Sequence, residues 1–301
     1  MPVVNIINIK KQFQDQEVIK GMDFQLSERK CIALLGANGA GKTTTLKMLA
    51  GLVKPDSGSI VFEGAEKADF RRLIGYLPQF PVFYEWMTGN EFLEYAGQLA
   101  GLPKSEAKDR AKELLELTGI AEAKNRRIGK YSGGMKQRLG IAQAIIHRPK
   151  LVMLDEPVSA LDPFGRREVL ELMDKLKKES AILFSTHILN DAEEICDEIL
   201  FLHNGELVES GTLTGLRTKH QQAKIDLAFK ENTLQYAEEL SLLQPVSSMK
   251  LDGEYASFFV EDIEYARELF LTEIMQRNLP LVKFEISRTR LEDVFMKVVQ
   301  K

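Results

Sequence analysis

Short apolar runs separated by turn residues predict β-strands around one helix over the first part of the chain. Residues 31–35 are continuously apolar, as in a buried strand, whereas residues 3–9 alternate weakly and precede a polar segment at 10–17. Residues 46–50 have helical character, and Gly51 ends them. We expect strands at 3–9, 24–26, 31–35, 59–63 and 73–77.

Helical periodicity then replaces the strand pattern. Thr88 and Glu91 have the spacing of a capping box, in which each side chain caps the backbone of the other. Apolar positions recur at helical spacing in three stretches, at 92–100, 103–117 and 139–146. We therefore expect an inserted helical subdomain over about residues 84–145.

A second group of strands follows this helical region. Residues 151–154 are apolar and end on Asp155 and Glu156, which favours a central parallel strand buried on both faces. The apolar run at 181–185 predicts a further buried strand. Asn204-Gly205 is a strong turn signal and predicts a hairpin of 199–202 with 206–210. Helices are expected at 163–178 and 190–197.

The last part of the chain is interpreted as a separate, small α+β domain. Residues 211–223 are polar and are expected to form a linker. Strands are expected at 224–230, 256–260 and 281–286, and helices at 232–240, 262–277 and 290–300. The predicted division is therefore a first domain at 1–215 and an accessory domain at 216–301.

The composition of the 301 residues limits the possible classes of protein. Apolar residues make up 44%, as in a globular protein, and no apolar run approaches the roughly 20 residues of a membrane helix. The first residues have no signal-peptide pattern, so we expect a cytoplasmic protein. The net charge of −4 argues against nucleic acid as a partner. Cys31 and Cys196 are expected to be reduced core residues.

One glycine-rich loop has the pattern G-x-x-x-x-G-K-[ST] between an expected strand and an expected helix, as phosphate binding requires. Its N–H groups and the positive end of the helix would face phosphate oxygens. Lys42 would reach the β- and γ-phosphates, the Thr43 hydroxyl would bind Mg²⁺, and Thr44 would contact the α-phosphate. The alternative is an incidental Gly-rich turn. The loop consists of Gly36, Ala37, Asn38, Gly39, Ala40, Gly41, Lys42, Thr43 and Thr44.

Polar residues at the ends of other expected strands complete a candidate site. Asp155 can hold Mg²⁺, and Glu156 can polarise a water for attack on the γ-phosphate. The alternative, a pair of exposed strand-end acids, fits poorly after an apolar run. His187 follows the next apolar strand, which makes a catalytic role as plausible as a structural one. Gln79 also follows a strand, but is uninformative by itself.

A second anion-binding device lies away from this loop in the sequence. Ser132-Gly133-Gly134 precedes a helix, and Ser132 is suited to cap it. Two phosphate-binding devices for one nucleotide are unusual within one chain.

The order of these motifs resembles that of the ATP-binding subunit of an ABC transporter, over about residues 1–215. The resemblance implies an α/β fold, namely the P-loop NTPase fold of the ABC ATPase type. It also implies that Gln79 contacts Mg²⁺ or the attacking water and senses a membrane partner, and that His187 contacts the γ-phosphate. Ser159 to Asp162 would form the D-loop. Phe13 would stack on adenine, the alternative being a strand-end core residue.

The same resemblance implies ATP and Mg²⁺ as ligands and ATP hydrolysis that energises transport. Two subunits would face head to tail, so that each ATP lies between the glycine-rich loop of one chain and Ser132-Gly133-Gly134 of the other. We expect a homodimer, bound to a separate membrane-spanning permease at the inner face of the cell membrane. Tyr131 departs from the Leu that is usual in the family, and we expect this replacement to change the local packing but not the activity.

The last part of the chain, residues 220–301, resembles the C-terminal extension of multidrug and antibiotic-resistance export systems. We therefore expect export, with either a regulatory or a merely dimer-stabilising extension. Two other classes stay open. One is an ABC-type ATPase that acts on the ribosome or another non-membrane partner, and the other is a kinase-like phosphotransferase, which would have no use for Ser132-Gly133-Gly134.

Overall fold

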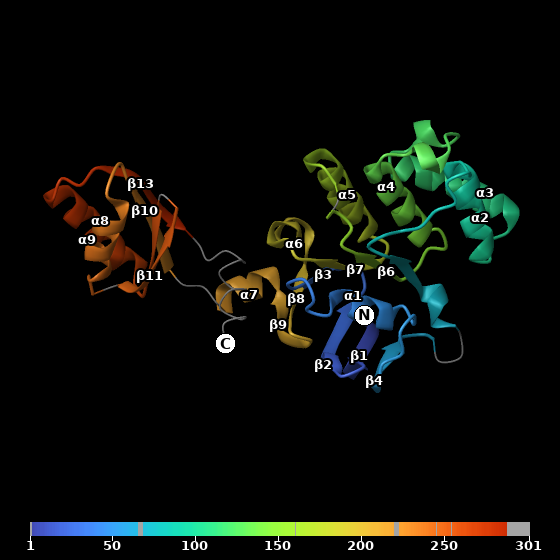
Figure 1. The fold of residues 1–301 in the computed structure, drawn as a ribbon, viewed down its shortest axis with the longest axis horizontal. Coiled ribbons are helices and arrows are strands. Elements are labelled where there is room, and N and C mark those ends of the chain that lie inside the picture. The colour runs from blue at the N-terminus through green and yellow to red at the C-terminus, as the bar shows by residue number, and fades with distance from the viewer. Residues whose placement is uncertain are drawn as a thin grey trace. The chain divides into compact units, whose positions relative to one another are not determined.

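The computed structural model describes residues 2–65, 69–159, 161–219, 223–244, 246–253 and 255–287. The chain forms two compact units, Met1–Leu213 and Thr214–Lys301, each with its own strands and helices (Figure 1). Among the described residues, none of the helices combines the length and the apolar character needed to cross a membrane.

A six-stranded sheet forms the centre of the first unit. Its strand order is β5-β6-β7-β3-β8-β9, and all neighbours are parallel except the β8–β9 hairpin. The strands are β3 (Cys31–Leu35), β5 (Ile74–Leu77), β6 (Leu151–Asp155), β7 (Ala181–Thr186), β8 (Glu198–His203) and β9 (Glu206–Thr212). All residues of β3, β6 and β7 are buried, which confirms the interpretation of the apolar runs as central strands.

A smaller antiparallel sheet, with strand order β2-β1-β4, packs its apolar residues into the same core. It consists of β1 (Pro2–Phe13), β2 (Gln16–Ser27) and β4 (Ser57–Phe62). The polar residues after Ile9 continue β1, because Lys10 and Lys11 pair with Lys20 and Ile19 of β2. The prediction that this strand ends at residue 9 is therefore wrong, since the backbone pairing that extends the strand does not require apolar side chains.

Helices lie on both faces of the six-stranded sheet (Figure 1). The helix α1 (Lys42–Leu49) contacts β6 and β2 on the side of the smaller sheet. The helices α5 (Pro163–Leu176) and α6 (Leu189–Ile195) contact each other, and α6 packs on β3 and β7. This layering brings the carboxyl ends of the parallel strands to the edge of the sheet where α1 begins, which is the usual ligand edge of an open α/β sheet.

The region in which a helical insertion is expected is largely helical. It comprises α2 (Gly89–Leu99), α3 (Lys104–Leu117), the 3₁₀ turns η2 (Ala121–Ala123) and η3 (Ile128–Lys130), and α4 (Gly133–Ala144); a further turn, η1 (Phe70–Leu73), precedes β5. Thr88 and Glu91 form the predicted capping box at the start of α2. The Asn204-Gly205 turn is also confirmed, with both residues at positive φ, as the hairpin requires.

The second unit has the order β10 (Ala223–Phe229), α8 (Thr233–Ser241), β11 (Val246–Asp252), β12 (Tyr255–Val260), α9 (Ile263–Gln276) and β13 (Leu281–Ser287). Its antiparallel sheet has the order β11-β12-β10-β13, which is the ferredoxin-like βαββαβ arrangement.

The structure differs from the sequence-based expectation at two places in this region. The strand β11 was not expected, because it is a mostly polar edge strand. The linker expected at 211–223 is wrong in part, since it contains α7 (Leu213–Lys219), which buries Leu216. The helix expected at 290–300 lies outside the described residues.

Candidate nucleotide site

The glycine-rich loop connects β3 to α1, as the sequence predicts. Two of its glycines, Gly36 and Gly41, have close neighbours where a side chain would stand. A Cβ atom on Gly36 would lie 2.3 Å from the carbonyl oxygen of Leu202. Gly41 has a φ of 107° in the position before α1, a conformation that favours glycine. The loop therefore needs these two glycines to fit between β2, β8 and the start of the helix.

Lys42 is folded back over the loop and is only 5% exposed. Its Nζ donates to the carbonyl oxygens of Gly36, at 2.9 Å, and Ala37, at 3.2 Å. It lies 3.7 Å from Oε1 of Glu156. Burial lowers the pKa of Lys42, and the carboxylates of Glu156 and Asp155 partly restore it. A buried ammonium held by carbonyls and one carboxylate is suited to exchange these partners for phosphate oxygens.

Asp155 lies at the end of β6 and is 1% exposed. Its Oδ1 accepts hydrogen bonds from Thr43, at 3.1 Å, and from Ser185, at 2.6 Å. Its Oδ2 is buried and has no hydrogen-bond partner among the described residues. A hydroxyl beside an unsatisfied carboxylate oxygen is the hard oxygen donor set that Mg²⁺ prefers, so these residues fit the cation implied by the motif.

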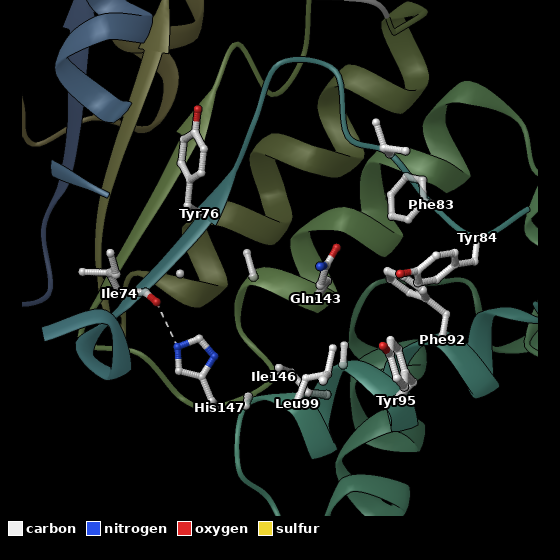
Figure 2. Close-up of a pocket in the computed structure, with 15 residues that line it drawn as sticks. Ile74, Tyr76, Phe83, Tyr84, Phe92, Tyr95, Leu99, Gln143, Ile146 and His147 are labelled. Atoms are coloured by element: carbon white, nitrogen blue, oxygen red, sulfur yellow. Dashed lines mark hydrogen bonds between the residues drawn. The ribbon is translucent and has the colours of Figure 1, made fainter. Parts of the chain in front are cut away.

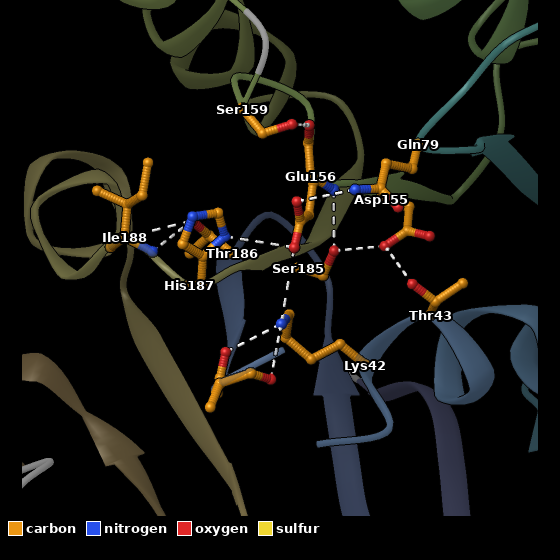
Figure 3. A network of polar contacts seen from close by, with 12 residues as sticks. Lys42, Thr43, Gln79, Asp155, Glu156, Ser159, Ser185, Thr186, His187 and Ile188 are labelled. Carbon is orange, nitrogen blue, oxygen red and sulfur yellow. Dashed lines mark hydrogen bonds and ion pairs between the residues drawn. The ribbon is translucent and has the colours of Figure 1, made fainter. Parts of the chain in front are cut away.

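Glu156 is the centre of the site, as Figure 3 shows. Its φ of 48° turns the chain out of the strand, and its N–H donates to the hydroxyl of Ser185 at 2.9 Å. Gln79 Nε2 donates to Oε2 at 3.0 Å, and His187 Nδ1 lies 3.3 Å from Oε1. A left-handed glutamate costs free energy unless its surroundings hold it. Here side chains from two loops, Gln79 and His187, and from α1, Lys42, converge on its carboxylate.

A cavity of about 370 Å³ lies over the glycine-rich loop. Its lining includes both loop residues and the residues after the strands, namely Val18, Asn38, Gly39, Gly41, Lys42, Thr43, Thr44, Gln79 and Glu156. Val18 and Ser185 were missed by sequence reasoning. Val18 belongs to β2 and has no polar atom to mark it, whereas Ser185 was read only as the last residue of a buried strand. The only available sign of a role for Ser185 was a hydroxyl in that otherwise apolar run.

Several predicted residues lie outside this cavity lining. Ser132 caps α4 by accepting from the N–H of Met135 at 3.2 Å, but neither it nor its two glycines line the cavity. Phe13 is 45% exposed, which does not fit the core alternative, and Lys11 Nζ lies 5.2 Å from its ring centroid. It does not line the cavity either.

The two ends of the expected D-loop have local contacts. Ser159 donates from its hydroxyl to the carbonyl oxygen of Glu156 at 3.2 Å, so it touches the backbone of the central residue. Asp162 caps α5, where its carboxylate accepts from the N–H of Gly165 at 2.7 Å.

A second hollow, of about 540 Å³, lies between β5, α2 and α4 (Figure 2). Its lining is uncharged and rich in aromatic rings, including Tyr76, Phe83, Tyr84, Phe92 and Tyr95, with Gln143 and His147 as polar members. Nearby Phe80, Val82 and Trp86 are 80%, 91% and 69% exposed. Exposed apolar side chains beside an apolar groove are typical of an interaction surface.

The fold, the phosphate-binding loop and the convergent strand-end residues define a nucleotide-binding protein of the P-loop class. Comparison with known proteins gives the family. The sequence profile of the ABC transporter family matches residues 19–159, and the profile "ATP-binding protein DrrA1-3-like, C-terminal domain" matches residues 211–299. The chain belongs to the ABC transporter family, as an ATP-binding subunit that hydrolyses ATP.

Relatives and solved structures agree with this assignment. The chain is 48% identical over 297 residues to the uncharacterized ABC transporter ATP-binding protein YxlF of Bacillus subtilis, covering 99% of both chains. It is 30% identical to the bacitracin transport ATP-binding protein BcrA of Bacillus licheniformis, over 99% of this chain and 97% of that one. A solved ATP-binding subunit of an ABC transporter matches with a TM-score of 0.65 and 36% identity, covering 72% of this chain and 92% of that chain. The predicted family and fold class are therefore confirmed.

Proposed function

We propose that this chain energises export through a separate membrane-spanning subunit, working as a homodimer with two shared ATP sites. The observation that carries the proposal is the convergence of Lys42, Gln79 and His187 on the carboxylate of Glu156 beside the loop cavity. Three polar residues from separate elements meet one strained glutamate there, which is the geometry of a site rather than of a surface ion pair.

Each converging residue has a role that its position supports. The β- and γ-phosphates of ATP take the place of the Glu156 contact on Lys42, and Glu156 then accepts a proton from a water aimed at the γ-phosphorus. His187, 41% exposed beside Glu156, contacts the γ-phosphate. Phe13 offers a ring face for adenine at the end of β1.

Thr43, Asp155 and Gln79 would hold Mg²⁺, since Thr43 and the unpartnered Oδ2 of Asp155 lie beside the loop. The cation supplies positive charge that offsets the charge developing on the β- and γ-phosphate oxygens. Ser185 keeps the protein side of this arrangement in place, because its hydroxyl joins the Asp155 carboxylate to the Glu156 backbone.

The second anion-binding terminus supports the shared sites. Ser132 caps α4 away from the cavity of its own chain. Among the described residues, no atom lies within 4 Å of the position that a Cβ on Gly133 would take. The free N–H groups of such a terminus bind phosphate. Ser132-Gly133-Gly134 of one chain would complete the site on the partner chain, and Ser159 and Asp162 would lie at the same junction.

The uncharged groove between β5, α2 and α4 is the proposed docking surface for the membrane-spanning subunit. Its lining includes Tyr76 and Val82, each three residues from Gln79, so that a docked partner reaches the site through residues 77–84. Docking there would hold the chain at the inner face of the cell membrane. Export is supported by a relative named the Nod factor export ATP-binding protein I of a Rhizobium species, which is 32% identical over 98% of this chain and 96% of that one.

A complementation experiment tests the shared sites. A Lys42→Ala chain and a Ser132→Arg chain are each expected to be inactive alone. Mixed, they form one site with an intact glycine-rich loop from one chain and an intact Ser132-Gly133-Gly134 segment from the other, so ATP turnover should return. A mixture as inactive as its components contradicts the shared-site function.

A pull-down tests the membrane partner. Tagged chain is recovered from detergent-solubilised host membranes, and the bound proteins are identified by mass spectrometry. A stoichiometric polytopic membrane protein is expected. Recovery of ribosomal proteins in its place contradicts the transporter assignment and favours an ATPase that acts on the ribosome.

A further inference from the structure

Tyr131, the residue directly before the signature segment Ser132-Gly133-Gly134, is inserted into the helical subdomain. It is 6% exposed, and its hydroxyl donates to the carbonyl oxygen of Ala123 at 2.8 Å. Burial raises the pKa of Tyr131, and a hydrogen bond from the Gly89 backbone partly offsets this. The hydroxyl therefore stays protonated and joins the end of η2 to the first residue of α2.

Gly89 leaves the space that the Tyr131 hydroxyl fills. A Cβ atom on Gly89 would lie 2.2 Å from Oη and 3.1 Å from Cζ of Tyr131. The φ of Gly89 is not positive, so its backbone alone would accept alanine. Gly89 is buried as the first residue of α2, a position whose N–H has no partner within the helix. The need for glycine at this position is therefore set by the Tyr131 ring.

Backbone hydrogen bonds tie the two segments together on both sides of this pair. Ile128 N–H donates to Met87 O at 2.8 Å, and Gly129 N–H donates to Glu85 O at 3.0 Å. Lys136, in the first turn of α4, pairs with the Glu85 carboxylate at 2.9 Å. The start of α4, which presents the signature segment, is thus fixed to the residues that precede α2.

We propose that Tyr131 is a positioning residue for the signature segment, and that Gly89 is its obligatory partner. The inference rests on the proposed shared site. The hydroxyl sets the distance between the start of α2 and Tyr131. It thereby sets the position at which the N–H groups at the start of α4 contact the nucleotide bound by the partner chain. A leucine at 131 would have no hydroxyl and would remove the Oη atom that lies 2.2 Å from a Cβ at 89.

The test compares the effect of Gly89→Ala when it is placed on one or the other chain of a mixed dimer. The reference mixture contains a Lys42→Ala chain and a Ser132→Arg chain, and only one site per mixed dimer is intact. Gly89→Ala is added either to the Lys42→Ala chain, whose signature segment serves that site, or to the Ser132→Arg chain, whose signature segment does not. We expect ATP turnover to fall at least about tenfold in the first arrangement and to stay within about twofold in the second.

Two further variants test the contact itself. Adding Tyr131→Leu to the Gly89→Ala, Lys42→Ala chain should restore turnover to within about threefold of the reference mixture, because it removes the atoms that the new methyl group meets. Tyr131→Phe, which keeps the ring and loses the hydroxyl, should lower turnover only in the first arrangement. Tyr265→Phe, on an exposed tyrosine of the second unit, is the matched control and should have no effect.

The outcomes separate the inference from the function on which it rests. An equal loss in both arrangements indicates general destabilisation and overturns the positioning role, as does no loss in either or no rescue by Tyr131→Leu. An inactive reference mixture contradicts the shared-site function itself.

Discussion

The hydroxyl of Ser185 donates to Oδ1 of Asp155 across 2.6 Å and accepts from the N–H of Glu156 across 2.9 Å. One side chain from β7 therefore fixes both Asp155, the last residue of β6, and Glu156, the residue after it. The hydroxyl is fully buried, so no water replaces it. Asp155 and Glu156 depend on the neighbouring strand for their orientation.

Ser185→Ala should reduce both stability and turnover. It leaves the Glu156 N–H and part of the Asp155 carboxylate without a partner, at a cost of about 1–3 kcal/mol in the free energy of unfolding. Turnover should fall because Glu156 loses its anchor. Ser180→Ala is the control. Ser180 directly precedes β7, at the end of the strand opposite the site, and its hydroxyl donates to the carbonyl oxygen of Pro149 at 2.6 Å. It should lose stability and keep its turnover. Equal turnover in the two variants would contradict this role of Ser185.

His187→Ala should lower ATP turnover by about 100-fold, since it removes one donor to the charge that develops on the γ-phosphate. Its ring lies 3.3 Å from Glu156, within the site. The control is His203→Ala. The His203 ring lies in the β8–β9 hairpin, where its Nε2 contacts the side chain of Asn204. Steady-state turnover at saturating ATP is measured for both. Normal turnover in His187→Ala would remove this residue from the site.

Arg166→Met should destabilise the protein more than Arg167→Met does. Arg166 pairs with Asp191, whose carboxylate is fully buried, and Asp191 in turn accepts from Thr186, the residue before His187. Removing the cation leaves that carboxylate unpaired, and since Arg166 is itself partly exposed we expect a loss of about 1–3 kcal/mol. Arg167 makes an exposed pair with Glu171, for which about 0.5 kcal/mol is expected. Urea unfolding curves measure both, and equal losses would contradict the account.

Most of the site residues could be recognised from sequence motifs, whereas those whose role depends on tertiary packing could not. Lys42, Thr43, Asp155, Glu156 and His187 could be placed together from sequence, because parallel strands bring their carboxyl ends to one edge of the sheet. Gln79 was added to them only through the family resemblance. Val18 and Ser185 could not be assigned to the site from sequence. Their roles depend on which strands pair with each other, and no local sequence pattern encodes that pairing. For Ser132 the local capping role was predicted, but the structure of one chain does not test its proposed contact, because one chain does not contain the surface it would face.

The fold shows the same division. Buried strands such as β6 were predicted from continuous apolar runs, whereas β11 was missed because an edge strand with solvated residues has no such run. Tyr131 departs from the family pattern, and its consequence appeared only with the structure, in the missing side chain of Gly89.

The stability of the first unit should depend on pH through His147. Its Nε2 lies 2.9 Å from the Ile74 carbonyl oxygen, and burial lowers its pKa below the ordinary 6.5, an effect that this hydrogen bond only partly offsets. The unfolded chain therefore binds the proton first, so stability is retained above pH 6.5 and is lost as the pH falls. The loss relative to His147→Gln is at most about 1.4 kcal/mol per pH unit. Parallel curves for the two proteins between pH 7.5 and 5.5, a window of about one unit on each side of the ordinary value, would contradict this.

Glu156→Gln tests the central claim most directly, because it keeps the shape of the residue and removes its charge. The variant should bind MgATP without hydrolysing it, and the γ-phosphate should then hold two chains together. Size-exclusion chromatography with light scattering is run with MgATP, with MgADP and without nucleotide. The account predicts a dimer of the variant with MgATP only. A variant that stays monomeric at saturating MgATP, or that still hydrolyses it at the wild-type rate, would contradict the shared site centred on Glu156.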